Sequence, residues 1–197
     1  MENVNYFVYL GARIDASGKA TTEIRRRLAI ATAKLQKMMI LWKSQIIPLK
    51  MKILNACIFP IATYGCESWT LTKADEKRIN AFEMRCYRKM LRIPWTAKER
   101  NESVLNKVDL QNCQLLNQIK KQKLGYFGHT KRHDTLEKLC MEGAVEGRRG
   151  RGRPRRRWTQ DIADWMGKTT TEAGHQALER EDFRKTVWEA TSDKDPP

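Results

Sequence analysis

The chain has 197 residues, 41% of them hydrophobic, and a formal net charge of +15. No stretch approaches the roughly 20 consecutive apolar residues of a membrane span, and the first residues lack the basic-then-apolar pattern of a secretion signal. The cysteines form no C-x-x-C pair, so we expect reduced, mostly buried thiols in a nuclear or cytoplasmic protein that is not secreted. They are Cys57, Cys66, Cys86, Cys113 and Cys140.

Residues 6–14 (YFVYLGARI) are rich in β-branched and aromatic side chains and predict a strand or hairpin, followed by a turn at residues 15–18. Apolar residues occupy both alternating faces, as in a strand that is covered on both sides. The rest of the sequence predicts no convincing strand that could pair with it. We therefore expect the sheet to continue outside this chain, and the chain to be the C-terminal piece of a larger protein.

The next segment predicts an amphipathic helix over residues 22–43, because apolar side chains recur there at helical spacing. They are Ile24, Leu28, Ala31, Leu35, Met38 and Trp42. A basic stripe is expected on the opposite side of this helix, formed by Arg26, Arg27, Lys34 and Lys37. Pro48 suits the first turn of a second helix through Ile58, which Pro60 is expected to kink or end.

A third helix is predicted from Thr72, whose side chain forms a capping pair with Asp75, to about residue 92. Its apolar face is Ile79, Phe82, Cys86 and Met90. About a quarter turn away lies a second basic stripe, formed by Arg78, Arg85, Lys89 and Arg92. Charged helix faces are often merely solvated. Two stripes of one sign beside apolar packing faces nevertheless favour a groove that follows a phosphate backbone.

Shorter helices are predicted at 102–108, 113–127 and 134–142, and further helical segments at 159–166 and 171–190. Between them, residues 143–158 have the composition of a flexible linker. The fold class is therefore mainly α. Its expected parts are an N-terminal strand or hairpin over residues 1–18, a helical bundle over 19–142, the Arg/Gly-rich linker, and a small helical segment over 159–197.

The linker contains seven arginines uninterrupted by any acidic residue: Arg148, Arg149, Arg151, Arg153, Arg155, Arg156 and Arg157. Close like charges repel, so this tract should stay solvated until it meets an anion. Residues 1–110 are also basic, with 20 Lys and Arg against 10 Asp and Glu, whereas residues 161–197 have 5 against 9. The cationic main part together with the tract indicates a nucleic-acid partner.

Other interpretations of the tract remain open. It could be a soluble linker or a nuclear-import signal. The segment Arg151–Pro154 (RGRP) matches the core of an AT-hook, whose arginines enter the narrow minor groove of A·T-rich DNA. A stand-alone AT-hook-like DNA-binding protein and a basic scaffold for protein partners are therefore alternative functions.

Catalytic or metal-binding groups are not evident in the sequence. Phosphodiester chemistry commonly needs clustered carboxylates that hold two metal ions, and no Asp-Asp pair occurs. A zinc site formed by Cys113, His129, His133 and Cys140 is conceivable, but its spacing matches no compact zinc finger. We expect no catalytic residue, metal ligand or cofactor in this chain.

In blocks at residues 9–11, 64–69, 124–129 and 148–165, the sequence resembles reverse transcriptases of non-LTR (LINE-like) retrotransposons. Residues 9–11 (YLG), with the following turn and Arg-rich helix, are similar to the end of the palm in that family, and residues 64–69 (YGCESW) resemble the YG-x-E-x-W segment of the thumb region. Residues 124–129 (LGYFGH) and 148–165 (RRGRGRPRRRWTQDIADW) resemble the C-terminal part of RTE-like elements. The blocks follow the family order and span nearly the whole chain.

The resemblance implies an RNA-directed DNA polymerase that copies element RNA at a nicked chromosomal target. In that family the palm aspartates and the endonuclease lie upstream of the region matched here, so Mg²⁺ is expected only for the full-length polymerase. For this chain the resemblance implies a palm end at residues 1–18 and a thumb-like bundle at 19–142 that holds a template-primer duplex of RNA and DNA. Activity is not expected from this chain alone, which we interpret as part of a truncated or degenerate element copy.

Overall fold

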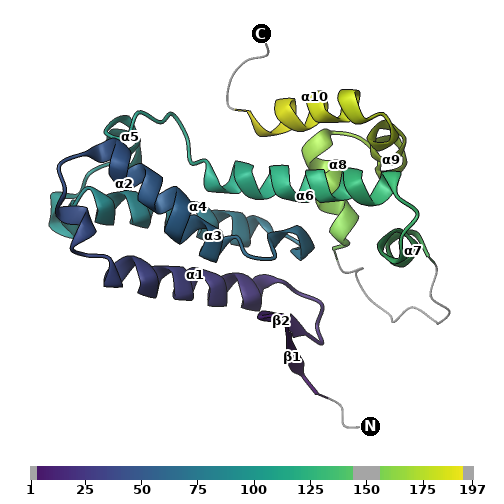
Figure 1. The fold of residues 1–197 in the computed structure, drawn as a ribbon, viewed down its shortest axis with the longest axis horizontal. Coiled ribbons are helices and arrows are strands. Elements are labelled where there is room, and N and C mark those ends of the chain that lie inside the picture. The colour runs from purple at the N-terminus through teal and green to yellow at the C-terminus, as the bar shows by residue number, and fades with distance from the viewer. Residues whose placement is uncertain (1–3, 144–155, 193–197) are drawn as a thin grey trace. The chain divides into compact units, whose positions relative to one another are not determined.

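The computed structural model describes residues 4–143 and 156–192 and is mainly helical (Figure 1). It divides into two compact units, residues 1–119 and residues 120–197. Helix α6 (Leu115–Arg132) contributes its first turn to the first unit and the rest to the second. The predicted helical bundle extends to residue 142, whereas the first compact unit ends at residue 119.

The first unit begins with a hairpin of two antiparallel strands, β1 (Tyr6–Tyr9) and β2 (Ala12–Asp15) (Figure 1). Leu10 and Gly11 both have positive φ, 46° and 77°, which is the backbone of a tight hairpin turn. The interpretation of residues 6–14 as one strand buried on both faces is wrong, because the chain reverses at Gly11 and Phe7 and Val8 are exposed. The predicted turn at residues 15–18 is confirmed by a bond from the Gly18 N–H to the Asp15 carbonyl, 2.9 Å.

Helix α1 (Thr21–Lys37) ends earlier than the predicted residue 43, and a 3₁₀ turn, Leu41–Lys43, follows it. The chain turns back after Lys37 so that Trp42 is buried and its indole N–H donates to the Leu35 carbonyl, 3.1 Å. This bond satisfies one of the carbonyls that a helix leaves unpaired at its C-terminus. Trp42 therefore belongs to the apolar face as predicted, but through tertiary packing.

The second predicted helix is continuous across Pro60. It consists of α2 (Ile47–Ile53), a π-helical turn (Leu54–Ile58) and α3 (Phe59–Ala62). In a regular helix the proline ring collides with the carbonyl four residues earlier. That carbonyl belongs to Ala56, within the wider π turn, which accommodates the ring. Pro48 lies in the first turn of α2, as predicted.

Helix α4 (Lys73–Met90) has the predicted capping box: the Asp75 N–H donates to the Thr72 hydroxyl, 3.2 Å, and the Thr72 N–H to the Asp75 carboxylate, 3.4 Å. Asp75 is fully buried and also accepts from the Thr21 hydroxyl, 3.0 Å, so one carboxylate links the starts of α1 and α4. Helix α1 packs against α3 and α4, and α4 against α5 (Asn101–Asn106).

Buried Glu83 on α4 caps the beginning of α6. Its carboxylate accepts from the N–H groups of Gln114 and Leu115, 2.7 and 2.9 Å, and from the Tyr87 hydroxyl, 2.5 Å. Burial raises the pKa of Glu83 above its ordinary value, although these hydrogen bonds act in the opposite direction. The α6 N-terminus is thereby fixed to the helix that carries the second basic stripe.

The second unit contains the remainder of α6, α7 (Leu136–Glu142), α8 (Trp158–Met166), α9 (Thr170–Leu178) and α10 (Arg180–Thr191). Its core consists of Leu124, Phe127, Ile162, Ala173, Ala177, Phe183 and Val187. Gly128 allows Phe183 to approach α6, because a Cβ atom there would lie 2.5 Å from the Phe183 ring. The segment predicted at 171–190 is two helices that meet at Glu179, whose backbone is extended.

Candidate nucleic-acid interface

A groove runs between α1 and α4 in the first unit. Ala29, Thr32 and Ala33 of α1 and Ala81 of α4 line it. The rest of its uncharged lining is Leu28, Gln36 and Phe82. Arginines lie on both sides: Arg25 from α1, and Arg78 and Arg85 from α4. The arrangement suits a polyanion that is bound by its backbone.

The stripe on α4 lies largely as predicted. Arg85, Lys89 and Arg92 are exposed, and Arg85 lines the groove. Arg78 is half-buried and donates to the Asp75 carboxylate, 2.7 Å, so part of its charge is neutralised within the chain. The helix ends at Met90, and Arg92 lies beyond it in a left-handed backbone conformation, φ 58°. Arg85 and Lys89 are therefore the most available cations of this stripe.

The stripe on α1 is not one surface. Lys34 and Lys37 are exposed but do not line the groove. Arg27 was predicted on the polar side, and this is wrong. Its position follows Ile24 by three residues and precedes Ala31 by four, which places it on the buried face, and its exposed fraction is 9%.

Arg26 and Arg27 instead attach the hairpin to α1. Both donate to the Glu23 carboxylate at 2.7 Å and to the Gly11 carbonyl in the hairpin turn. The Arg27 guanidinium also lies over the Tyr64 ring, 4.2 Å from its centroid, and the Tyr64 hydroxyl donates to the Leu10 carbonyl, 2.8 Å. These contacts assign both arginines a structural role.

The Glu23 carboxylate also accepts from the Arg13 N–H of β2, 3.1 Å. Burial by itself would raise the pKa of Glu23, but the hydrogen bonds from Arg26, Arg27 and the Arg13 N–H outweigh it and hold the pKa below its ordinary value. Glu23 therefore remains a carboxylate that binds two arginines.

A second hollow adjoins the groove at the C-terminal end of α4. Its lining includes Arg85 and Lys89, and it continues to Trp95 and Lys98 in the segment after the helix. Sequence reasoning missed Arg25, Trp95 and Lys98 as candidates. Arg25 could have been found from the helical period. Successive residues of a helix point in different directions, so Arg25 lies on another side of the helix than Arg26 and Arg27. Trp95 carries no helical periodicity that would have distinguished it from a core residue.

Most of the arginine tract, including Arg148, Arg149, Arg151, Arg153 and Arg155, lies outside the described residues, as does the RGRP segment. Arg157 is described and exposed. Arg156 donates to the carboxylates of Asp161, 2.7 Å, and Asp164, 2.6 Å. Asp161 is fully buried and also pairs with Lys123, 2.5 Å. Arg156 therefore differs from the expected solvated tract, because it takes part in the ionic network of the second unit.

Among residues 4–143 and 156–192, no three His, Cys, Asp or Glu side chains are grouped so that they could hold a metal ion. His129 and His133 lie close together, with ring centroids 4.4 Å apart. The expectation of mostly buried thiols holds for Cys66 and Cys86, and burial raises the pKa of Cys86 to about 12. Cys57 and Cys140 are exposed.

The chain is similar to a transposon-derived protein. The chain is 29% identical over 137 residues to a protein of Caenorhabditis elegans that is described as transposon-derived, and the match covers 67% of this chain. It covers 48% of the relative, so the chain spans about half of that protein. No protein-family model matches the chain, and no solved structure does. The similarity is consistent with an origin in a transposable element. None of the described helices combines the length and apolar character of a membrane span.

Proposed function

We propose that this chain is the nucleic-acid-binding C-terminal part of a transposable-element RNA-directed DNA polymerase of the non-LTR type. Its role is to hold a template-primer duplex of RNA and DNA in a nuclear or cytoplasmic protein. The observation that carries the proposal is the groove between α1 and α4, with its arginines on both sides. The similarity to a transposon-derived protein supports the origin of the chain in a transposable element.

The groove has the chemistry of backbone recognition. Guanidinium groups match phosphate oxygens in pairs, and their binding releases condensed counterions. Arg25 and Arg85 are exposed and stand on opposite helices of the groove, so they can contact successive phosphates or the two strands of a duplex. Phosphate contacts carry no sequence information directly, so binding through them is expected to be largely independent of sequence.

The set of binding residues is narrower than the sequence suggested. We assign Arg25 and Arg85 to the groove and Lys89 to the hollow that adjoins it, with Lys34, Lys37 and Arg92 as exposed cations that add to the positive field. Arg26 and Arg27 are removed from it because they hold the hairpin. We assign catalysis and Mg²⁺ to the upstream palm of a full-length polymerase, so the isolated chain should not extend a primer.

The first prediction concerns affinity in solution. The chain should bind a DNA duplex or an RNA–DNA hybrid with a Kd of about 1 µM or weaker at physiological salt. A plot of the logarithm of the association constant against the logarithm of the salt concentration should have a slope of about −0.9 for each phosphate contacted. Reversing Arg25, Arg85 and Lys89 to Glu should weaken binding about ten-fold or more and reduce that slope. Fluorescence anisotropy with a labelled duplex between about 50 and 200 mM salt measures both.

A matched control separates the groove from net charge. Lys19, Lys43 and Lys52 are exposed lysines of the same unit that line neither the groove nor the adjoining hollow. Their reversal to Glu changes the net charge equally and should reduce affinity much less. Equal losses in the two triple variants would reject the groove as a site. Affinity that hardly depends on salt would reject the electrostatic proposal altogether.

A further inference from the structure

Trp95 is the most exposed aromatic side chain among the described residues, with 91% of its surface accessible. It lies in a short 3₁₀ turn, Trp95–Ala97, which follows Pro94 directly after the end of α4. An indole has a large apolar surface whose burial is favourable, and tryptophan is enriched at binding interfaces. The question is which ligand it fits.

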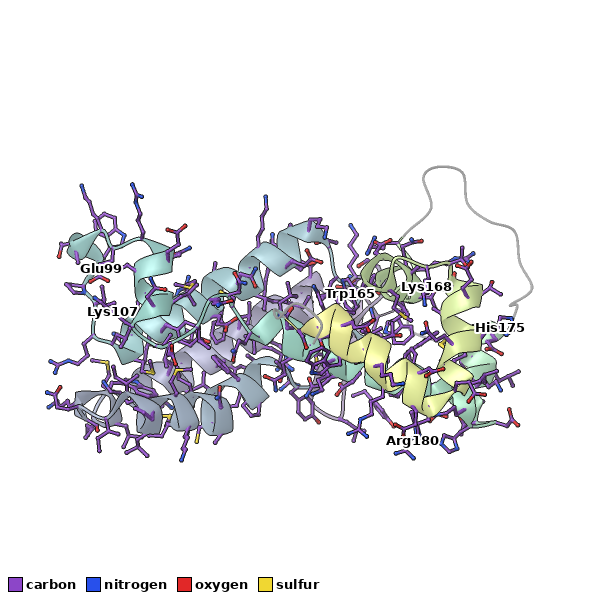
Figure 2. The ribbon with its side chains drawn as sticks, turned by 90° about the horizontal axis from the view of Figure 1, so that it is seen from above. Glu99, Lys107, Trp165, Lys168, His175 and Arg180 are labelled. Carbon is purple, nitrogen blue, oxygen red and sulfur yellow. The ribbon has the colours of Figure 1, made fainter. Side chains whose placement is uncertain are left out.

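The segment that follows Trp95 is held by several side-chain contacts. Arg88 on α4 donates to the Glu99 carbonyl, 3.1 Å, and to the Asn101 side chain, 2.7 Å. Lys107 pairs with the Glu99 carboxylate, 2.7 Å, and Figure 2 shows these two side chains close together. The indole is therefore presented by an anchored loop, which lowers the entropy cost of ordering it on binding.

One residue on each side of Trp95 has a left-handed backbone conformation, which is unfavourable for residues with a Cβ atom. They are Arg92, φ 58°, and Lys98, φ 46°. Such conformations persist where the surrounding structure fixes them, and they are frequent at ligand sites. Here they turn the chain so that Trp95 and Lys98 line the same hollow as the C-terminal end of α4.

The hollow beside Trp95 is lined by both apolar and cationic side chains. Ala81, Ile93 and Pro94 contribute the apolar part, and Arg85, Lys89 and Lys98 the charges. Within the part of the chain that the structure describes, these three cations take part in no ion pair. Glu99 also lines the hollow, but Lys107 neutralises it. A planar apolar ligand with attached negative charge fits this combination.

We propose that Trp95 is a stacking platform for an unpaired nucleotide at the end of the strand that the α1–α4 groove holds. Arg85 lines both the groove and the hollow, so a phosphate backbone in the groove leads directly to the indole. The base stacks on the Trp95 ring, while Lys89 and Lys98 contact its phosphates. An apolar protein partner fits less well, because it would have to bury three unpaired cations. The inference rests on the proposed function.

The test compares a blunt duplex with the same duplex carrying a single-stranded extension, in separate DNA and RNA versions. The intact chain should bind the extended duplexes more tightly. Trp95→Ala should weaken binding to them about ten-fold, while binding to the blunt duplex changes less than about two-fold and the salt slope is retained, because no charge is lost. Trp95→Phe should keep most of the affinity. The DNA and RNA extensions show which nucleotide the platform prefers.

Trp188→Ala is the control, since Trp188 is a partly exposed tryptophan of the second unit. It should leave all binding unchanged, and thermal unfolding checks that each variant is folded. If Trp95→Ala leaves every affinity unchanged, or weakens blunt and extended duplexes equally, the stacking platform is rejected and the proposed duplex binding survives. If the intact chain binds no nucleic acid in a salt-dependent way, both proposals fail.

Discussion

Glu23 receives hydrogen bonds from two parts of the chain that are joined by a turn, so a single carboxylate connects β2 to α1. Its donors are the Arg13 N–H of β2 and the guanidinium groups of Arg26 and Arg27. Because the pKa of Glu23 is lowered in the folded protein, its contribution to stability is present above its ordinary value of 4.5 and is lost as pH falls through the folded pKa. Because the pKa of Glu23 is lowered, acid should weaken this connection only at a pH below the range in which an ordinary glutamate is protonated.

Replacing Glu23 with Gln tests this expectation. The variant should lose about 2 kcal/mol of unfolding free energy at neutral pH, because two buried or half-buried arginines lose a charged acceptor. Its stability should also depend less on pH below about 4.5 than that of the unaltered protein. Urea unfolding at neutral and acid pH measures both effects. Glu76→Gln is the control: its pair with exposed Lys73 should be worth less than about 1 kcal/mol, and an equally large loss there would contradict the assignment.

At the scale of elements, local signals were reliable where the relevant residues are close in sequence. The capping pair Thr72–Asp75 and the position of Pro48 were both predicted correctly, since each depends on a few neighbouring residues. Tertiary contacts decided the rest. Periodicity alone could not show that α1 ends at Lys37 to let Trp42 turn back, or that Arg27 is buried against Glu23 and Tyr64.

Two glycines of α6 provide an element-scale prediction with a built-in control. Alanine is a better helix former than glycine by about 1 kcal/mol. Gly125→Ala has nothing within 4 Å of the added Cβ and should stabilise the protein by up to that amount. Gly128→Ala would place its Cβ 2.5 Å from the Phe183 ring and should instead destabilise by about 1–3 kcal/mol. Thermal unfolding compares them; a stabilising Gly128→Ala would show that Phe183 does not pack against α6 as described.

At the scale of the whole molecule, composition predicted a cationic protein and hydrophobic periodicity a mainly helical one, and the fold class is confirmed. What composition could not give is which charges are free. Arg26, Arg27, Arg78 and Arg156 all have carboxylate partners in the chain, and only their three-dimensional surroundings distinguish them from Arg25 or Arg85. The groove needed the pairing of α1 with α4, which no single segment encodes.

The arginine tract is expected to contain two kinds of residue: arginines that bind nucleic acid, and Arg156, which pairs with carboxylates of the second unit. Replacing Arg148, Arg149, Arg151, Arg153 and Arg155 with Gln should weaken binding and flatten the salt slope by up to about 0.9 per lost contact, with unfolding nearly unchanged. Arg156→Gln should lower the unfolding free energy by about 1 kcal/mol, because buried Asp161 loses a donor. Salt titrations and thermal unfolding distinguish the two. If the five-residue variant removes all binding, the groove is not a site, and a preference for A·T-rich over G·C-rich duplex would favour the AT-hook alternative.

The hairpin β1–β2 is fixed by polar contacts at its tip and along β2, while Phe7 and Val8 remain exposed. Its attachment therefore depends on the protonation state of one glutamate and on two backbone carbonyls, whereas the helices behind it are joined by a buried apolar core. Such a segment opens as a separate cooperative unit, with a free energy below that of global unfolding. Acid strong enough to protonate Glu23, at a pH below its ordinary pKa of 4.5, would then release residues 4–15, and their amide hydrogens would exchange with solvent while those of α1 and α4 stayed protected.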